Sequence, residues 1–141
     1  MRYLILVIAT SVGCQAFSQN LRPTDPLAHT FSIVARDPAT GEMAVAVQSL
    51  YFNVGASVSW GEAGVGVVAT LSFTNKSFGM RGLELLKQGK SPEQALEILL
   101  SDDEARDFRQ VAILDTKGRV ATHTGWNRVQ RERKGDHGCT A

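Results

Sequence analysis

The chain has 141 residues, of which 43% are hydrophobic and 21% are charged, a balance that excludes an intrinsically disordered protein. Its formal net charge of +1 gives no strong field toward nucleic acid or an anionic membrane, so neither is expected as a partner. His29, His123 and His137 lie far apart and show no metal-ligand spacing. We therefore expect neither a metal nor a cofactor.

The first 18 residues have the pattern of a signal peptide. Arg2 provides a positive start, and residues 4–12 form an apolar run shorter than the roughly 20 residues that a membrane span needs. Ala16-Phe17-Ser18 supplies small residues for cleavage after Ser18. The pattern predicts export to the periplasm or the extracellular space and no transmembrane span. Two alternatives are lipidation of Cys14, which ends a loose lipobox-like match, and a buried N-terminal element.

The remaining length is on the order of 120 residues, which suits one domain. We expect a leader over residues 19–29, a folded domain over 30–125 and an irregular charged tail over 126–141. Only Cys139 would remain after loss or lipidation of the other cysteine, so no intramolecular disulfide is expected.

Residues 30–35 and 43–49 alternate between apolar and small or polar side chains, with turn-forming residues 37–42 between them. The pattern predicts a β-hairpin that begins at Thr30. Thr30 itself has an ordinary interpretation too, because threonine favours strands in general.

The register of this hairpin follows from its apolar side chains. Pairing Phe31 with Val47 gathers the large apolar residues on one face, as register selection favours. This register places Thr30 opposite Gln48, with Ser49 next to them.

Residues 64–69 match G-x-G-x-x-A, but the β-branched residues from Val67 onward predict a buried third strand over residues 65–72 rather than a nucleotide-binding loop. The following segment, residues 73–79, is predicted to be a polar loop. Asn75 and nearby backbone N–H groups could line a pocket there, or the loop could be purely structural.

Two helices are expected next. The first carries an apolar stripe from Met80 and stops at Gly89, and the second begins with a capping box at Ser91. Residues 109–115 and 119–125 then predict two more strands. Strands and helices are segregated, so the sequence predicts an α+β fold with a mainly antiparallel sheet and helices on one face. His123 is expected to be a strand-face residue.

Six sequence blocks follow in a fixed order: HTFSIVARDPATGE (29–42), VAVQS (45–49), AGVGVVAT (63–70), SFGMRGLELL (77–86), RQVAILD (109–115) and GRVATHTG (118–125). Together they resemble the family called domain of unknown function 1028, which is grouped with the N-terminal-nucleophile (Ntn) hydrolases. The resemblance covers Thr30 to Gly125. It implies a proteasome-subunit-like αββα sandwich, here incomplete because the chain looks truncated or frameshifted after Gly125.

The resemblance also implies site residues. Thr30 takes the nucleophile position, and Gln48 and Ser49 fall where proteasome-like relatives place an Asp-Ser pair. Ser72 and Phe73 lie where such folds draw the donors of an oxyanion hole.

The chain also departs from that pattern. No lysine lies between Thr30 and Asn75, so the base would be the α-amine of Thr30. Freeing that amine requires a second cut, after the leader.

These observations predict an exported amidohydrolase or peptidase-like protein that acts on a small-molecule or peptide amide. Two alternatives are a non-enzymatic peptide- or glycan-binding module on the same fold and an inactive fragment. An open sheet face would also suit a homo-oligomer.

Overall fold

The computed structural model describes residues 30–126, which form two antiparallel sheets in the α+β arrangement expected from the sequence. The predicted signal peptide and leader, the alternative of lipidation at Cys14, and the predicted tail over 126–141 apart from Trp126 lie outside the described residues. The described elements are β1 (Phe31–Arg36), β2 (Met43–Gln48), α1 (Gly55–Val58), β3 (Ser59–Glu62), β4 (Gly66–Ser72), α2 (Ser77–Lys87), α3 (Pro92–Ser101), the 3-10 turn η1 (Arg106–Phe108), β5 (Arg109–Asp115) and β6 (Val120–Thr124).

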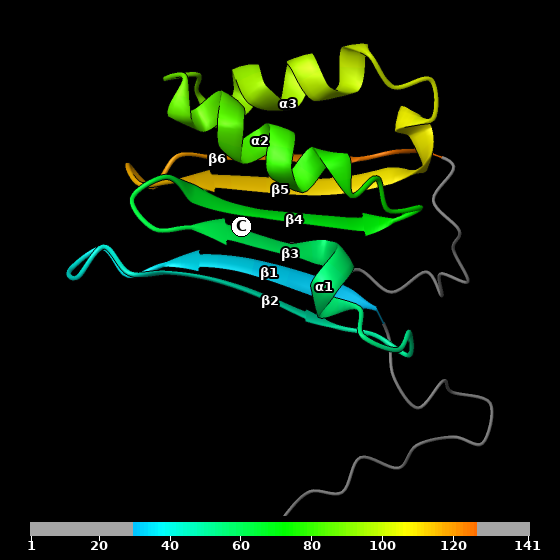
Figure 1. Ribbon diagram of the computed structural model, residues 1–141, viewed down its shortest axis with the longest axis horizontal. Helices are drawn as coiled ribbons and strands as arrows, with labels where there is room; N and C mark the ends of the chain where they lie inside the picture. Colours follow the sequence, from blue (N-terminus) through cyan, green and yellow to red (C-terminus); the bar gives the residue numbers. More distant parts are fainter. Residues whose placement is uncertain (1–29, 127–141) are drawn as a thin grey trace, which may run out of the picture.

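Three layers are stacked in the molecule (Figure 1). The middle layer is a four-stranded sheet with the order β3-β4-β5-β6, in which all neighbours are antiparallel. Helices α2 and α3 cover one face of this sheet, and the β1-β2 hairpin covers the other. Strand β4 is buried from Gly66 to Leu71 because it is covered on both faces, which explains its continuous apolar sequence.

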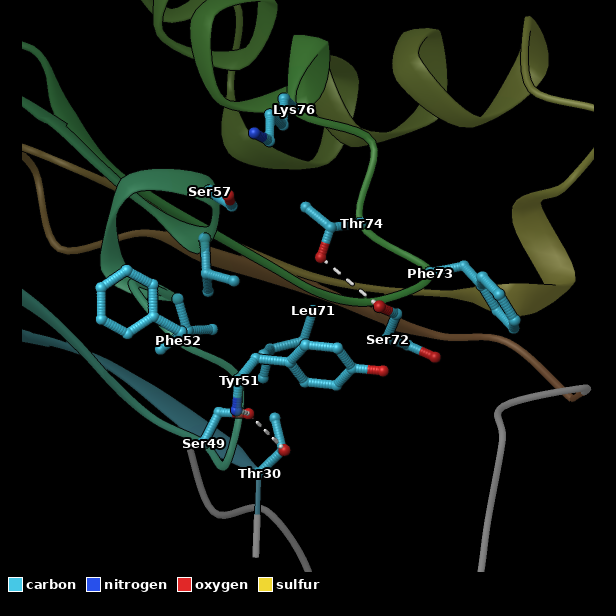
Figure 2. A pocket seen from close by; sticks show the side chains of 12 residues that line it. Thr30, Ser49, Tyr51, Phe52, Ser57, Leu71, Ser72, Phe73, Thr74 and Lys76 are labelled. Carbon is cyan, nitrogen blue, oxygen red and sulfur yellow. Dashed lines mark hydrogen bonds between the residues drawn. The ribbon is translucent and has the colours of Figure 1, made fainter.

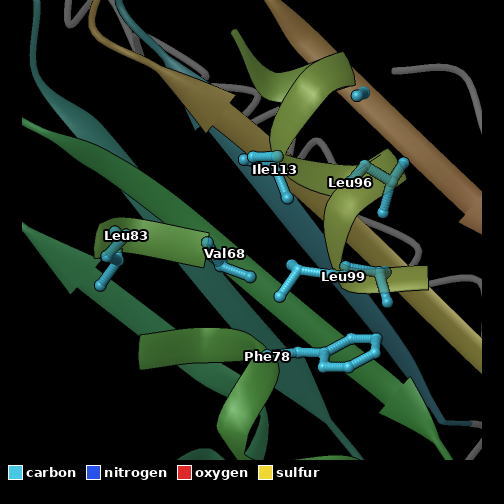
Figure 3. Close-up of a cluster of buried hydrophobic side chains, with 9 residues drawn as sticks. Val68, Phe78, Leu83, Leu96, Leu99 and Ile113 are labelled. Atoms are coloured by element: carbon cyan, nitrogen blue, oxygen red, sulfur yellow. The ribbon is translucent and has the colours of Figure 1, made fainter. Parts of the chain in front are cut away.

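The main core lies between the helices and the middle sheet (Figure 3). Phe78 of α2, Leu99 of α3 and Ile113 of β5 are fully buried there, together with Val68 of β4. The second helix begins as expected: the Ser91 hydroxyl accepts from the Gln94 N–H at 3.3 Å, and the Gln94 side chain accepts from the Ser91 N–H at 3.0 Å. The capping box is therefore confirmed.

The hairpin register is one residue away from the predicted one. Phe31 pairs with Gln48 instead of Val47, and Ile33 pairs with Ala46. The turn explains the difference: the Asp37 N–H donates to the Glu42 carbonyl at 2.9 Å. A closed turn of this size fixes which residues face each other, and here it prevails over the gathering of apolar side chains.

The shift changes the side chains on each face. Val34, Val45 and Val47 are half-buried against the middle sheet, whereas Phe31 and Ile33 are 58% and 57% exposed on the outer face. The apolar residues of the hairpin are thus divided between two faces.

The segment from Val54 to Gly66 contains two elements that the sequence did not predict, the short helix α1 and strand β3. Trp60 of β3 packs against Gly79 of α2, and its indole N–H donates to the Ser57 carbonyl at 3.2 Å. Gly79 is required here because a Cβ at this position would overlap the indole ring.

We expect Gly79→Ala to destabilise the protein by about 1–3 kcal/mol, because the cost of overpacking exceeds the gain of up to about 1 kcal/mol from replacing a helical glycine. Gly55→Ala in α1 is the control, since a Cβ there meets nothing within 4 Å. Urea unfolding should show a lower free energy of unfolding for the Gly79 variant alone. Equal stability of the two variants would contradict the close packing of Trp60 on Gly79.

Candidate functional site

A pocket of about 520 Å³ opens where three strand ends meet (Figure 2). Thr30 immediately precedes β1, Ser49 immediately follows β2, and Ser72 ends β4. The hairpin lies over β4, so these three ends come to the same edge of the two sheets. Four of the residues singled out in the sequence therefore line one pocket: Thr30, Ser49, Ser72 and Phe73.

The closest polar contact in the pocket joins two hydroxyl groups. Thr30 Oγ1 lies 2.9 Å from Ser49 Oγ; Thr30 is exposed and Ser49 is half-buried. Ser49 Oγ also accepts from the Tyr51 N–H at 3.2 Å, which leaves its own proton available for Thr30. The observed register produces this pair, because Thr30 and Ser49 continue the ladder one step beyond Phe31 and Gln48.

The prediction that Gln48 lies beside Thr30 is wrong. Gln48 pairs with Phe31 and is exposed on the outer face of the hairpin, and it does not line the pocket. Successive residues of a strand point to opposite faces, so a slip of one residue moves Gln48 away and brings Ser49 to Thr30.

The wall at the end of β4 has an unusual backbone. Ser72 has a φ of 68°, in the left-handed region that residues other than glycine rarely adopt. The next N–H, that of Phe73, donates to the Phe108 carbonyl at 3.3 Å. That N–H is therefore engaged by a neighbouring segment and is not free to bind a substrate oxygen in this conformation.

An ion pair behind this wall holds it in place. Arg109 Nε lies 2.6 Å from an oxygen of Asp103, and the two side chains are only 14% and 10% exposed. The same guanidinium donates to the Phe73 carbonyl. The hydrogen bond from Arg109 lowers the pKa of Asp103, so the pair is charged at neutral pH.

Asn75 does not line the pocket. Its side-chain oxygen accepts from the Ser77 N–H at 3.1 Å and from the Ser77 hydroxyl at 2.7 Å, so it caps the start of α2. Of the two alternatives for this loop, the purely structural one accounts for the contacts of Asn75.

Lys76 lines the pocket, although the sequence suggested a site without a lysine. Figure 2 shows Lys76 at the opposite end of the pocket from Thr30, beyond Ser57 and Thr74. It comes from the loop after β4, so the rule that strand ends gather at one edge could have found it.

The Tyr51-Phe52 part of the rim follows β2, and no sequence motif marked it as part of a site. The lining residues that the sequence did not indicate are Tyr51, Phe52, Val54, Ser57, Val58, Leu71, Thr74 and Lys76.

Two further features of residues 30–126 concern metal-binding groups and membrane-spanning helices. No group of three or more His, Cys, Asp or Glu in this range could hold a metal ion, and no helix in it is long and apolar enough to cross a membrane. His123 lies on β6, as expected, and its Nε2 is 2.9 Å from the Arg106 carbonyl oxygen, outside the pocket.

The fold and site thus define an α+β sandwich with a hydroxyl-lined pocket at one sheet edge. Residues 30–141 match the family described as "Family of unknown function (DUF1028)", and the chain belongs to this family. The matched range continues past Gly125, where the resemblance was expected to end.

A solved structure supports this assignment. Protein SPO2555 from Silicibacter pomeroyi, of the same family, is 34% identical and superposes with a TM-score of 0.67. The match covers 70% of this chain and 46% of that protein, so the chain spans less than half the length of this relative. No curated protein matches the chain.

We expect Asp103→Ala to lower the free energy of unfolding by about 3 kcal/mol at pH 7, because it leaves Arg109 nearly buried without its partner. The carboxyl pKa is lowered in the folded state, so the pair stabilises the protein above the unfolded value near 3.8 and loses this effect as the pH falls toward the folded value. The difference in free energy of unfolding between wild type and the Asp103 variant should therefore be smaller at pH 3 than at pH 7.

Asp102→Ala is the matched control in urea unfolding, because the Arg81–Asp102 pair is 45% and 64% exposed. It should change stability by at most about 1 kcal/mol. Equal losses of stability in the two variants would contradict a stabilising ion pair between Asp103 and Arg109. So would a stability difference between wild type and the Asp103 variant that does not depend on pH.

Proposed function

We propose that this protein is an exported Ntn-type amide hydrolase in which Thr30 is the nucleophile. The observation that carries the proposal is the contact of 2.9 Å between Thr30 Oγ1 and Ser49 Oγ at the mouth of the pocket. A hydroxyl immediately before a strand, open to a pocket and paired with a second hydroxyl, suits nucleophilic attack on a carbonyl carbon.

The choice of base follows from what lines the pocket. Its twelve residues include no histidine and no carboxylate. A threonine hydroxyl is a weak nucleophile without a base, and the group nearest to it along the chain is its own α-nitrogen. That nitrogen is an amide while residue 29 precedes it and becomes a basic amine once the chain is cut before Thr30.

The proposed reaction has two steps. Thr30 Oγ1 attacks the amide carbonyl, its proton passes to the α-amine, and the leaving amine departs with a proton, which leaves an ester on Thr30. Water then hydrolyses the ester with the α-amine again as base. The Ser49 hydroxyl orients Thr30 Oγ1, and an oxyanion donor from the Ser72-Phe73 wall requires that the Phe73 N–H first leave the Phe108 carbonyl.

A second candidate is a non-enzymatic peptide- or glycan-binding module. The observation that favours it is a rim of exposed aromatic rings: Tyr51, Phe52 and Phe73 are 81%, 100% and 55% exposed. Such rings supply large contact areas for peptides and sugars. In this case Thr30 would never become the first residue.

The proposal predicts that Thr30→Ala abolishes hydrolysis of any peptide amide that the wild type cleaves, whereas Thr30→Ser retains part of it. Ser49→Ala should slow turnover about 10- to 100-fold through loss of one oriented hydroxyl. Stability should change by only about 1 kcal/mol, because Thr30 is exposed and Ser49 is only half-buried. Release of fluorescent amines from a library of peptide amides measures the rates, and mass spectrometry of the exported protein identifies its first residue.

Gln48→Ala is the control, since this residue is next in sequence to Ser49 but lies on the outer face. Its rate should stay within about twofold of wild type. Full turnover by Thr30→Ala, or an active protein that still carries residues before Thr30, would refute the proposal.

A further inference from the structure

The pocket is neutral apart from one side chain. Lys76 is the only charged residue among the twelve that line it. Its place at the far end from Thr30 separates the cation from the proposed reacting hydroxyl, as Figure 2 shows. Lys76 is therefore suited to hold a distant part of a substrate rather than to activate Thr30.

Lys76 also has no anionic partner among residues 30–126. The ion pairs there are made by Arg81, Lys87, Arg109 and Arg119, and none of them involves Lys76. A lysine without a carboxylate neighbour, on the wall of a pocket that contains no acid, offers its charge to a ligand.

The N–H groups at the start of α2 are engaged within the chain. The Ser77 N–H donates to Asn75, the Phe78 N–H to the Asn75 carbonyl at 3.0 Å, and the Gly79 N–H to the Lys76 carbonyl at 3.3 Å. The ammonium of Lys76 is thus the charged group at this end that can receive an anion.

Between the two ends the pocket lining is mainly apolar, with the hydroxyl groups of Ser57 and Thr74 nearer to Lys76. Leu71, which is 4% exposed, lies between Thr30 and Lys76, and Val58, which is 1% exposed, also lines the pocket. A ligand that fits this order of groups has a carbonyl at one end, an aliphatic segment, and an anion at the other.

We propose that the pocket takes amides with a carboxylate on an aliphatic side chain, as in acidic peptides, and that Lys76 binds this carboxylate. This inference rests on the proposed function for the orientation of the substrate. It adds a specificity-determining residue and a substrate class.

The test uses two matched probes, N-acetyl-glutamic acid α-amide and N-acetyl-glutamine amide, which differ only in the side-chain carboxylate. Binding is measured by NMR titration of the full chain carrying Thr30→Ala, so that no turnover occurs. The glutamyl probe should bind about three- to tenfold more tightly, and this preference should weaken as ionic strength rises.

Lys76→Met should abolish the preference, Lys76→Arg should keep it, and Lys90→Met, which changes a lysine outside the pocket, should leave it unaltered. Equal binding of both probes, binding of neither, or a preference that survives Lys76→Met would overturn the inference. Because every titration is done without the Thr30 hydroxyl, these results are independent of whether Thr30 is a nucleophile.

Discussion

The register of the β1-β2 hairpin is the constraint on which the site depends. The turn between Asp37 and Glu42 sets it, and it brings Thr30 Oγ1 to 2.9 Å from Ser49 Oγ on the face that lies over the middle sheet. A slip of one residue would exchange the faces of one strand and separate this pair. The same register leaves Phe31 and Ile33 exposed, so the turn geometry, and not the burial of apolar surface, decides which hydroxyls meet.

The elements of the fold were largely predictable because each carries a local signal. The β-branched run of β4, the capping box at Ser91 and the alternating strands on either side of residues 115–118 were predicted with nearly their observed limits. The helix α1 and strand β3 were missed because a four-residue element has no periodicity to detect. Trp60 and Gly79 show that tertiary packing stabilises this part.

The site was predictable where strand ends gather and unpredictable where side chains depend on a register. Thr30, Ser49, Ser72 and Phe73 line one pocket as a consequence of topology. Gln48 was misplaced because the apolar pattern of the two strands is consistent with a register that the turn does not allow. Lys76 was overlooked although it lies in the loop after β4, at the edge where the strand ends gather.

The central claim is that the Thr30 hydroxyl is a nucleophile, and covalent trapping tests it most directly. The exported protein would be treated with a β-lactone, which acylates reactive hydroxyl groups, and then digested and mapped by mass spectrometry. The account predicts a single ester, on Thr30, in a peptide that begins with this residue. A protein that begins at Thr30 but remains unmodified, or that is acylated at another residue, would contradict it.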